Sequence, residues 1–294
     1  MKKAHWDRNL VELIRRCATD LPADVELVIR GARRRERKDS DAHRLLSSIL
    51  DRTAVARRDS LPLCQGTGTL TFIFTVPTGF DTNGLASLAR GAVSKATRLG
   101  YLHLNAVDPI SGAHYPTNVA HESPIMEFRH GARKTVDVRL MIKSGVCENM
   151  GQQYSLPDPV LAAPCELEGV RLCVLDAVSK MGAGDHTPGV LGVCIGGDRA
   201  KGYAHAKEQF LRKLNDRSSV KVLARLEDRL LRDSRQMGNC SPDAGAVGPI
   251  LGVKIGTLSR LPESFFVSVS YMCWAFRRRG VLLGPEGGVH RWVY

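Results

Sequence analysis

The chain has 294 residues, of which 43% are hydrophobic and 24% are charged. This is enough apolar side chain to bury a sizeable core and is close to the average for a globular protein. It contains no stretch of about 18 uncharged apolar residues, so the sequence excludes a transmembrane helix. The N-terminus is basic but lacks the apolar region of a secretory signal, which makes the cytoplasm the expected location.

The formal net charge is +12, and much of the excess lies in two runs, 33–38 and 277–279. Both runs are expected at the solvated surface, because charged side chains are rarely buried. Aromatic residues make up only 6%, and no finger, RNP or helix-turn-helix pattern accompanies the charge. Nucleic-acid binding is therefore the least favoured interpretation. Attraction of small dianionic substrates is another use of the same field.

Helical and strand periodicities are interspersed along the chain, without a regular βαβ repeat, an internal repeat or a linker. We therefore expect a mixed α+β fold, with one domain over residues 1–294 and a partly antiparallel sheet flanked by helices. The long polar segment 102–127 is predicted to be a functional loop. Helices are predicted at 4–20, 40–57, 82–99, 198–212 (with Asp198 as N-cap) and 220–236, strands at 70–76, 134–142, 186–197, 247–255 and 265–271, and a solvated connection at 31–41.

The eight cysteines form no C-x2-C pair, and in a reducing compartment most should be small buried apolar residues. Some lie in four glycine-rich or strand-edge segments, at 64–68, 143–149, 186–197 and 272–274. Glycine lets backbone N–H groups approach a ligand closely, and a thiolate there is a candidate ligand for a soft metal. By themselves these features predict only a cluster or anion site. The cysteines are Cys17, Cys64, Cys147, Cys165, Cys173, Cys194, Cys240 and Cys273.

Five short segments occur in a distinctive order. They are C-Q-G-T-G at 64–68, L-N-A-V at 104–107, K-S-G-V-C-E-N at 143–149, H-T-P-G-V-L-G-V-C-I-G-G at 186–197 and C-W-A-F-R-R at 273–278. In order and approximate spacing they resemble the class I iron–sulfur fumarate hydratases and L-tartrate dehydratases. The last segment is similar to the end of the α subunit in the two-subunit enzymes.

This resemblance implies a hydro-lyase that adds water to, or removes it from, a C4 dicarboxylate such as fumarate and malate, or tartrate and oxaloacetate. It also implies a separate β subunit carrying the second catalytic lobe, and pairing of α subunits. One iron of a [4Fe–4S] cluster would stay open as a Lewis acid. The implied residues are Cys64, His186 and Cys273 for the cluster, Gln65 and Lys143 for catalysis, and Gln65, His103, Asn105, Asn118, Lys143 and Gly145 for substrate.

Several positions depart from the family pattern. His186 stands where the family has a cysteine, and it is either an imidazole ligand or a polar loop residue left after ligand loss. Cys194 lies about 25 Å further along an extended strand, so it could substitute only after a sharp bend. Gly66 replaces an aspartate, His103 an arginine and Cys147 a serine. These changes fit either an active enzyme or a paralogue that keeps the fold as a binding or assembly subunit.

Overall fold

The computed structural model describes residues 3–181, 186–238 and 250–294. Helices and mixed sheets together confirm the predicted α+β class, and none of the described helices is long and apolar enough to cross a membrane. Backbone contacts group the chain into two compact units, while one domain over 1–294 stays a prediction. Unit 1 comprises Met1–Ala23, Asp51–Gly145 and Ala275–Tyr294, and unit 2 comprises Asp24–Leu50 and Val146–Trp274.

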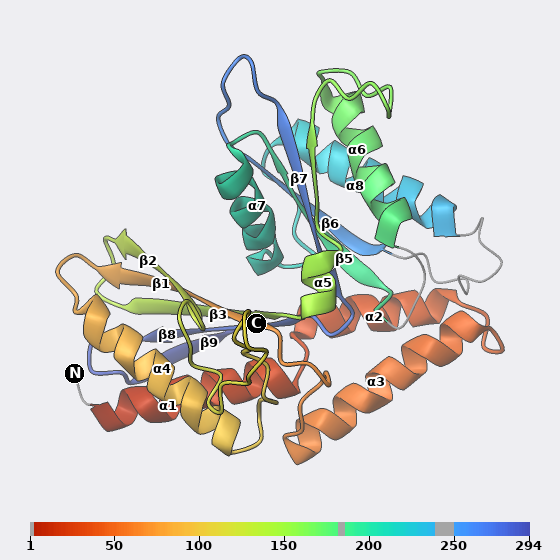
Figure 1. The fold of residues 1–294 in the computed structure, drawn as a ribbon. Helices are drawn as coiled ribbons and strands as arrows, with labels where there is room; N and C mark the ends of the chain where they lie inside the picture. The colour runs from red at the N-terminus through yellow and green to blue at the C-terminus, as the bar shows by residue number, and fades with distance from the viewer. Residues whose placement is uncertain (1–2, 182–185, 239–249) are drawn as a thin grey trace. The chain divides into compact units, whose positions relative to one another are not determined.

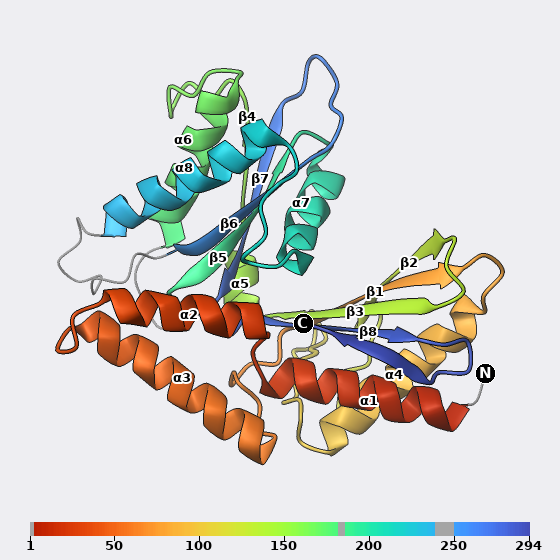
Figure 2. The ribbon, with the colours of Figure 1, turned by 180° about the vertical axis from the view of Figure 1, so that it is seen from behind.

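Unit 1 is built on a five-stranded sheet. Its elements are α1 (Lys3–Thr19), β1 (Thr69–Pro77), α4 (Thr82–Arg98), β2 (Ile125–Gly131), β3 (Val136–Lys143), β8 (Arg277–Leu283) and β9 (Val289–Val293). The strand order is β2-β1-β3-β8-β9, and only β1 and β2 run parallel among these pairs. The helices α1 and α4 pack against each other and cover one face of the sheet (Figures 1 and 2).

The core of unit 1 follows from strand periodicity. Successive side chains of a strand point to opposite faces, so every second residue of β1 faces the helices. Phe72 and Phe74 are fully buried there, and they lie opposite Leu140 and Val138 of β3. Trp6 of α1 belongs to the same apolar cluster. Burial of these large side chains fixes which face of the sheet the helices cover.

Unit 2 contains a four-stranded sheet. Its elements are α2 (Ala23–Arg35), α5 (Gly145–Asn149), β4 (Gln152–Ser155), α6 (Leu167–Met181), β5 (Gly189–Ile195), α7 (Arg199–Glu208), η1 (Gln209–Leu211), α8 (Lys221–Gly238), β6 (Ile250–Thr257) and β7 (Phe266–Cys273). The strand order is β4-β7-β5-β6, and β5 and β6 run parallel. Helix α7 packs on one face, and α6 and α8 lie on the other (Figure 2). The unit boundary crosses α3 (Asp41–Asp59).

Two expectations for local structure were wrong. The stretch 31–41 was expected to be a connection, but α2 continues through it to Arg35, because Val25, Ile29 and Ala32 form a buried stripe at helical spacing. The segment 143–149 was expected to be a loop, but it contains the short helix α5. The predicted N-cap is confirmed, since the Asp198 side chain accepts a hydrogen bond from the Lys201 amide. The predicted strand at 247–255 is observed from Ile250 onward, and 247–249 lie outside the described residues.

The basic run at 277–279 is buried, which corrects the expectation of a solvated surface. Arg277, Arg278 and Arg279 are 1%, 0% and 6% exposed, and they form the first half of β8 between β3 and β9. Their position inside the sheet overrides the usual preference of arginine for solvent. The run at 33–38, by contrast, is mostly exposed, as predicted.

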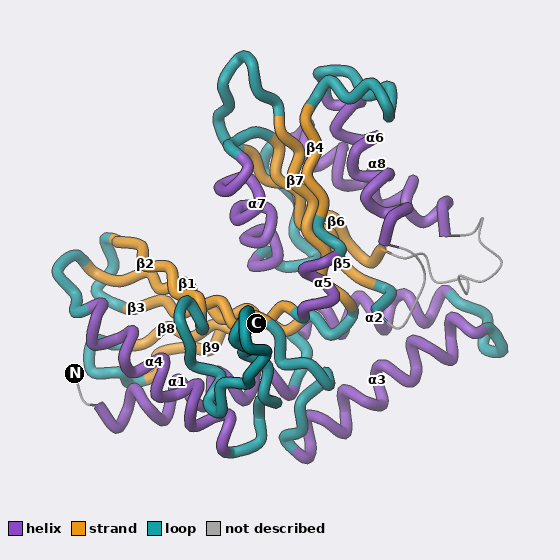
Figure 3. The backbone as a smooth tube through the Cα atoms, viewed as in Figure 1, coloured by secondary structure: helices purple, strands orange, loops and turns teal. Residues whose placement is uncertain are grey.

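The predicted irregular segment lies between α4 and β2, and most of it has no regular secondary structure (Figure 3). Two isolated antiparallel bridges lie within it, between Val107 and His114 and between Ala120 and Ser123. Loops of this length commonly carry functional groups on a rigid scaffold.

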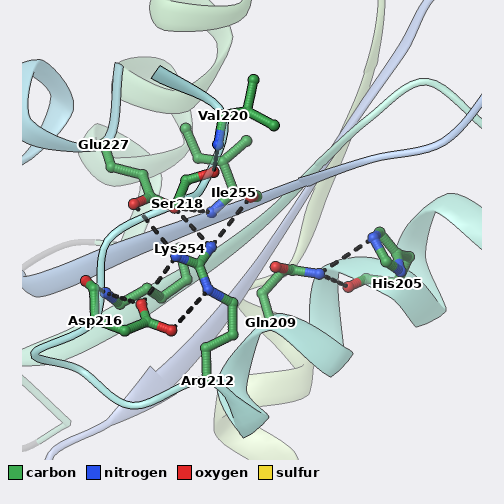
Figure 4. A network of polar contacts seen from close by, with 9 residues as sticks. All are labelled: His205, Gln209, Arg212, Asp216, Ser218, Val220, Glu227, Lys254 and Ile255. Atoms are coloured by element: carbon green, nitrogen blue, oxygen red, sulfur yellow. Dashed lines mark hydrogen bonds and ion pairs between the residues drawn. The ribbon is translucent and has the colours of Figure 1, made fainter. Parts of the chain in front are cut away.

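A network of charged side chains fastens the segment after η1 to β6 in unit 2 (Figure 4). Arg212 Nη1 and the Ile255 amide both donate to Glu227 Oε1, at 2.7 and 2.8 Å. Arg212 Nη2 and Lys254 Nζ both donate to Asp216 Oδ1, at 2.9 and 2.8 Å. Glu227 and Lys254 are 6% and 3% exposed, so their charges are compensated within the protein rather than by water.

We expect Glu227→Gln to lower the free energy of unfolding by about 3 kcal/mol, because it leaves the Arg212 guanidinium short of a buried counter-charge. Urea denaturation followed by circular dichroism measures this loss. The neighbouring Asp228→Asn provides a matched control. Asp228 pairs with Arg217 at the surface, so its loss should cost about 0.5 kcal/mol. Equal effects of the two variants would contradict a structural role for the buried network.

Candidate active site

The segment Cys64–Gly68 enters β1 and is held against the end of β3. The register places Thr69 opposite Lys143, and Gly68 adopts a φ of 88°, which favours glycine. A Cβ atom at Gly68 would lie 2.2 Å from the Lys143 carbonyl oxygen and 2.7 Å from Ser144 Cα. Only glycine therefore allows the two segments to lie this close, and the segments at 64–68 and 143–145 meet as a result.

Asn118 fastens the long loop beside the same segment. Its Oδ1 accepts hydrogen bonds from the amides of Asn105 and Ala106, at 2.7 and 3.0 Å. Its Nδ2 donates to the carbonyl oxygen of His103 at 2.8 Å and to Thr97 Oγ1 at 3.1 Å. The side chain is 1% exposed, and these four bonds use its whole hydrogen-bonding capacity.

The His103 carbonyl also connects the long loop to the first motif, because it accepts a hydrogen bond from Thr67 Oγ1 at 2.7 Å. The guanidinium of Arg277 donates from Nη1 to the Gly66 carbonyl oxygen at 3.3 Å. His103 and Asn105 remain exposed. Contacts within unit 1 thus join the three segments that carry most of the predicted site residues. These residues are Cys64, Gln65, His103, Asn105, Asn118, Lys143 and Gly145.

The other two predicted residues, His186 and Cys273, belong to unit 2. Cys273 is the last residue of β7 and lies opposite Gly189 of β5, three residues after His186. Tyr271 Oη donates to the His186 carbonyl oxygen at 2.7 Å. The Tyr271 ring packs directly on Gly189 of β5. Only glycine allows this contact, because a Cβ at Gly189 would lie 2.3 Å from Tyr271 Oη. Burial, followed by the charges of Cys273 and Cys147, raises the pKa of Tyr271, so it stays a hydrogen-bond donor.

Cys147 lies next to Cys273 in the same unit. The Cys273 amide donates to Cys147 Sγ at 3.4 Å, and both residues are buried. The neighbouring Glu148 receives Lys207 Nζ at 3.1 Å and Tyr203 Oη at 3.5 Å, which ties α5 to α7. Sequence reasoning missed Tyr271, whose only signal is its place two residues before Cys273 on one strand.

Three other cysteines are core residues, as the sequence predicted for most of the eight. Burial raises the pKa of Cys17 and of Cys173 to about 12, and that of Cys194 to about 11. All three are fully buried, as is typical of cysteines that pack as small apolar residues. Cys194 lies inside the regular strand β5, without the bend that substitution for His186 would need. Cys165 is exposed, and Cys240 lies outside the described residues.

The donor types of the predicted cluster ligands, two thiols and one imidazole, suit iron. Within the described part of the chain, no three His, Cys, Asp or Glu side chains form a group that could hold a metal ion. Cys64 belongs to unit 1, while His186 and Cys273 belong to unit 2. The chemistry of the donors fits an iron–sulfur cluster, but no single unit contains all three.

Comparison with known proteins agrees with this arrangement of motifs. The family model described as fumarate hydratase (Fumerase) matches residues 7–281, nearly the whole chain. The chain therefore belongs to the fumarate hydratase (Fumerase) family, as its motifs predicted.

Relatives within this family differ in length. A protein assigned as a class I fumarate hydratase in Geobacillus stearothermophilus is 36% identical over 97% of this chain, and the match covers 56% of that protein, so this chain spans little more than half of its length. A protein assigned as an L(+)-tartrate dehydratase subunit alpha in Methanocaldococcus jannaschii is 28% identical, and the match covers 92% of this chain and 94% of that protein. The L(+)-tartrate dehydratase subunit alpha of Escherichia coli is 27% identical, with 76% and 72% covered.

We expect Gly68→Ala to destabilise the protein by about 3 kcal/mol, because strain from the positive φ adds to a clash with the β3 backbone. Gly79→Ala is the matched control. Gly79 also has a positive φ, but its Cβ would meet no atom within 4 Å, so we expect a loss of about 1 kcal/mol. Thermal or urea unfolding measures both variants. If they lose the same stability, close packing at Gly68 does not hold the loop.

Replacing Asn118 by glycine should cost about 2 kcal/mol, since the amides of Asn105 and Ala106 lose their acceptor. Glycine accepts the φ of 57° at this position, so backbone strain does not confuse the result. Hydrogen exchange should accelerate at Asn105 and Ala106. Glu122→Gly tests the same backbone change at an exposed residue with a φ of 55°, and it should leave exchange at those amides unchanged. Unaltered exchange in the Asn118 variant would show that another contact holds the loop.

Proposed function

We propose that this chain is the α subunit of a two-subunit hydro-lyase, which adds water to or removes it from a C4 dicarboxylate. The substrate pair is fumarate and malate, or tartrate and oxaloacetate. The proposal rests chiefly on one observation. Cys64–Gly68, the His103–Asn105 segment and Lys143–Gly145 come from three separate parts of the chain, and they connect through specific contacts in unit 1.

The residues of unit 1 offer complementary polar groups for a dicarboxylate. Gln65, exposed beside Cys64, has an amide that both donates and accepts hydrogen bonds. Lys143 supplies a positive charge, and Asn105 supplies a second amide. Because Asn118 uses its full hydrogen-bonding capacity within the protein, its role in the proposal is to position Asn105 and His103. Gly145 leaves its backbone accessible to a ligand, since a Cβ there would meet no atom within 4 Å.

We further propose that Cys64, His186 and Cys273 hold a [4Fe–4S] cluster. When bound, such a cluster supplies an open iron as a Lewis acid for the substrate hydroxyl. Tyr271 fixes the His186 backbone by its hydrogen bond to the carbonyl, and β5–β7 pairing fixes Cys273. This part of the proposal is supported by the sequence resemblance and by the donor types.

The proposal includes a β subunit, which would contribute the base that takes the proton from the carbon beside the hydroxyl-bearing carbon. The names of the Methanocaldococcus and Escherichia relatives as alpha subunits, and this chain's coverage of them, support a separate partner. Pairing of α subunits and a cytoplasmic location remain part of the same proposal, carried by the family resemblance and the sequence.

The test is anaerobic co-purification of the chain with its β subunit, followed by iron and sulfide analysis and turnover assays. We expect about four iron and four sulfide per α chain, and hydration of fumarate or dehydration of L-tartrate. Cys64→Ser and Cys273→Ser should lose the cluster. Cys173→Ser is the control, because Cys173 is a fully buried core cysteine of α6 and is not among the proposed ligands.

His186→Cys should retain the cluster longer in air than the wild type, because it restores a third thiolate. If it removes the cluster, His186 is an imidazole ligand specific to this site. A folded, colourless and iron-free complex without turnover would contradict the hydro-lyase proposal. It would favour a paralogue that keeps the fold as a binding or assembly subunit.

A further inference from the structure

Arg277 is a buried cation whose hydrogen-bonding capacity is only partly used. It is 1% exposed, and its Nη1 donates to the Gly66 carbonyl oxygen at 3.3 Å. Its Nε and Nη2 have no hydrogen-bond partner among the described residues. No carboxylate of the described chain forms an ion pair with Arg277. A buried charge without a counter-charge is unfavourable, so this guanidinium calls for an anion from outside the polypeptide.

The two free nitrogens define what that anion should be. Nε–H and one Nη2–H point in parallel from one edge of a guanidinium, and together they match the two oxygens of a carboxylate. Unit 1 uses the same edge in this way at three other arginines, with all donor–acceptor distances between 2.6 and 2.8 Å. These pairs are Arg15 with Glu12, Arg58 with Asp59, and Arg139 with Asp137.

The adjacent arginines of β8 have compensating neighbours inside the protein. Arg278 lies over the rings of Phe276 and Tyr294, at 4.8 and 4.5 Å from their centroids. Arg279 forms an ion pair with Asp20 at 2.8 Å. Arg278 Nε and Nη1 and Arg279 Nη1 also have no hydrogen-bond partner in the described part of the chain, but only Arg277 leaves both Nε and Nη2 without one among these three residues.

The loop that contacts Arg277 lies at the surface of the protein. Gly66, the residue that Arg277 contacts, stands where the family pattern has an aspartate. A Cβ there would have Asn105 Oδ1 as its nearest neighbour, at 4.0 Å. Gln65 and Gly66 are exposed, and within the described chain the backbone of 64–66 makes no hydrogen bond to other backbone groups. Solvent does not reach Nε and Nη2 of Arg277 in this arrangement. A small ligand would reach them through a shift of this loop, which no backbone hydrogen bond at 64–66 opposes among the described residues.

We infer that Arg277 is a further carboxylate-binding residue of unit 1. Its Nε/Nη2 edge takes one carboxylate of a C4 dicarboxylate, which reaches it when the exposed loop at Gln65 and Gly66 shifts. The length of the ligand rests on the proposed function, while recognition of a carboxylate rests on the geometry of Arg277. This residue also supplies the bidentate guanidinium that is lost at His103, where the family pattern has an arginine.

The test uses the full chain, together with its β subunit where the two co-purify, and succinate as an unreactive C4 dicarboxylate. Succinate should raise the melting temperature of the wild type, whereas succinamide, its uncharged diamide, should not. Arg277→Lys keeps the positive charge but loses the two parallel N–H donors of the guanidinium. Its apparent Kd for succinate should therefore rise about tenfold or more. Arg139→Lys is the matched control. Arg139 already binds Asp137, so this variant should bind succinate within about twofold of the wild type.

A second variant separates binding from a structural role. Arg277→Met should melt no lower than the wild type without ligand, because it removes an uncompensated buried charge. It should also lose the shift caused by succinate. If the wild type shows no shift with succinate, or if Arg277→Lys binds it like the wild type, the inference is overturned. The inference is also overturned if Arg277→Met melts at a lower temperature than the wild type yet keeps the rise in melting temperature caused by succinate. If Arg277→Met does not fold, succinate binding by Arg277→Lys is the deciding measurement.

These measurements need neither turnover nor a cluster, so they fail independently of the proposed function. Succinate binding through Arg277 in an iron-free, inactive protein would leave this inference standing without the hydro-lyase. An active enzyme in which Arg277→Lys binds succinate normally would leave the hydro-lyase standing without this inference.

Discussion

The antiparallel pairing of β1 with β3 is the contact on which the site of unit 1 depends. It sets Thr69 opposite Lys143, so Gly68 packs directly on the backbone of Lys143 and Ser144. A slip of one residue would turn every side chain of β1 to the other face and remove Phe72 and Phe74 from the core. The same register that buries the core therefore brings the first motif to the third. The register of β1 with β3 therefore serves both the stability of the core and the proposed site.

Charge compensation gives the altered positions a common physical meaning. Relative to the family pattern, glycine at 66 removes a negative charge, and histidine at 103 removes a guanidinium. The two changes leave the local charge nearly balanced, and they also leave Arg277 as a buried cation whose Nε and Nη2 have no hydrogen-bond partner among the described residues. In unit 2 the buried charges of Glu227 and Lys254 are compensated by partners within the chain. A buried charge completed by the protein stabilises the fold, whereas an incomplete one can recognise a ligand.

Local patterns predicted the regular elements well where one side of the element is apolar. The predicted helices at 4–20 and 82–99 correspond to α1 and α4, and the predicted strand at 70–76 corresponds to β1. The pattern failed in β8, whose first three residues are arginines. Charge indicated solvent, but the strand lies inside the sheet between β3 and β9. Helix α2 was missed for a related reason, since its arginine-rich end masked the apolar stripe before it.

The sequence by itself determined the family and the α+β class, and it predicted the segments in which we place the site, because motif order and hydrophobic periodicity are properties of the chain alone. Only the tertiary structure decided which residues meet. It showed that Asn118 is committed to holding His103 and Asn105, that Tyr271 reaches the His186 carbonyl, and that Arg277 is buried with its carboxylate-binding edge free. Those facts depend on strand register and on contacts between residues far apart in sequence. No local pattern encodes them.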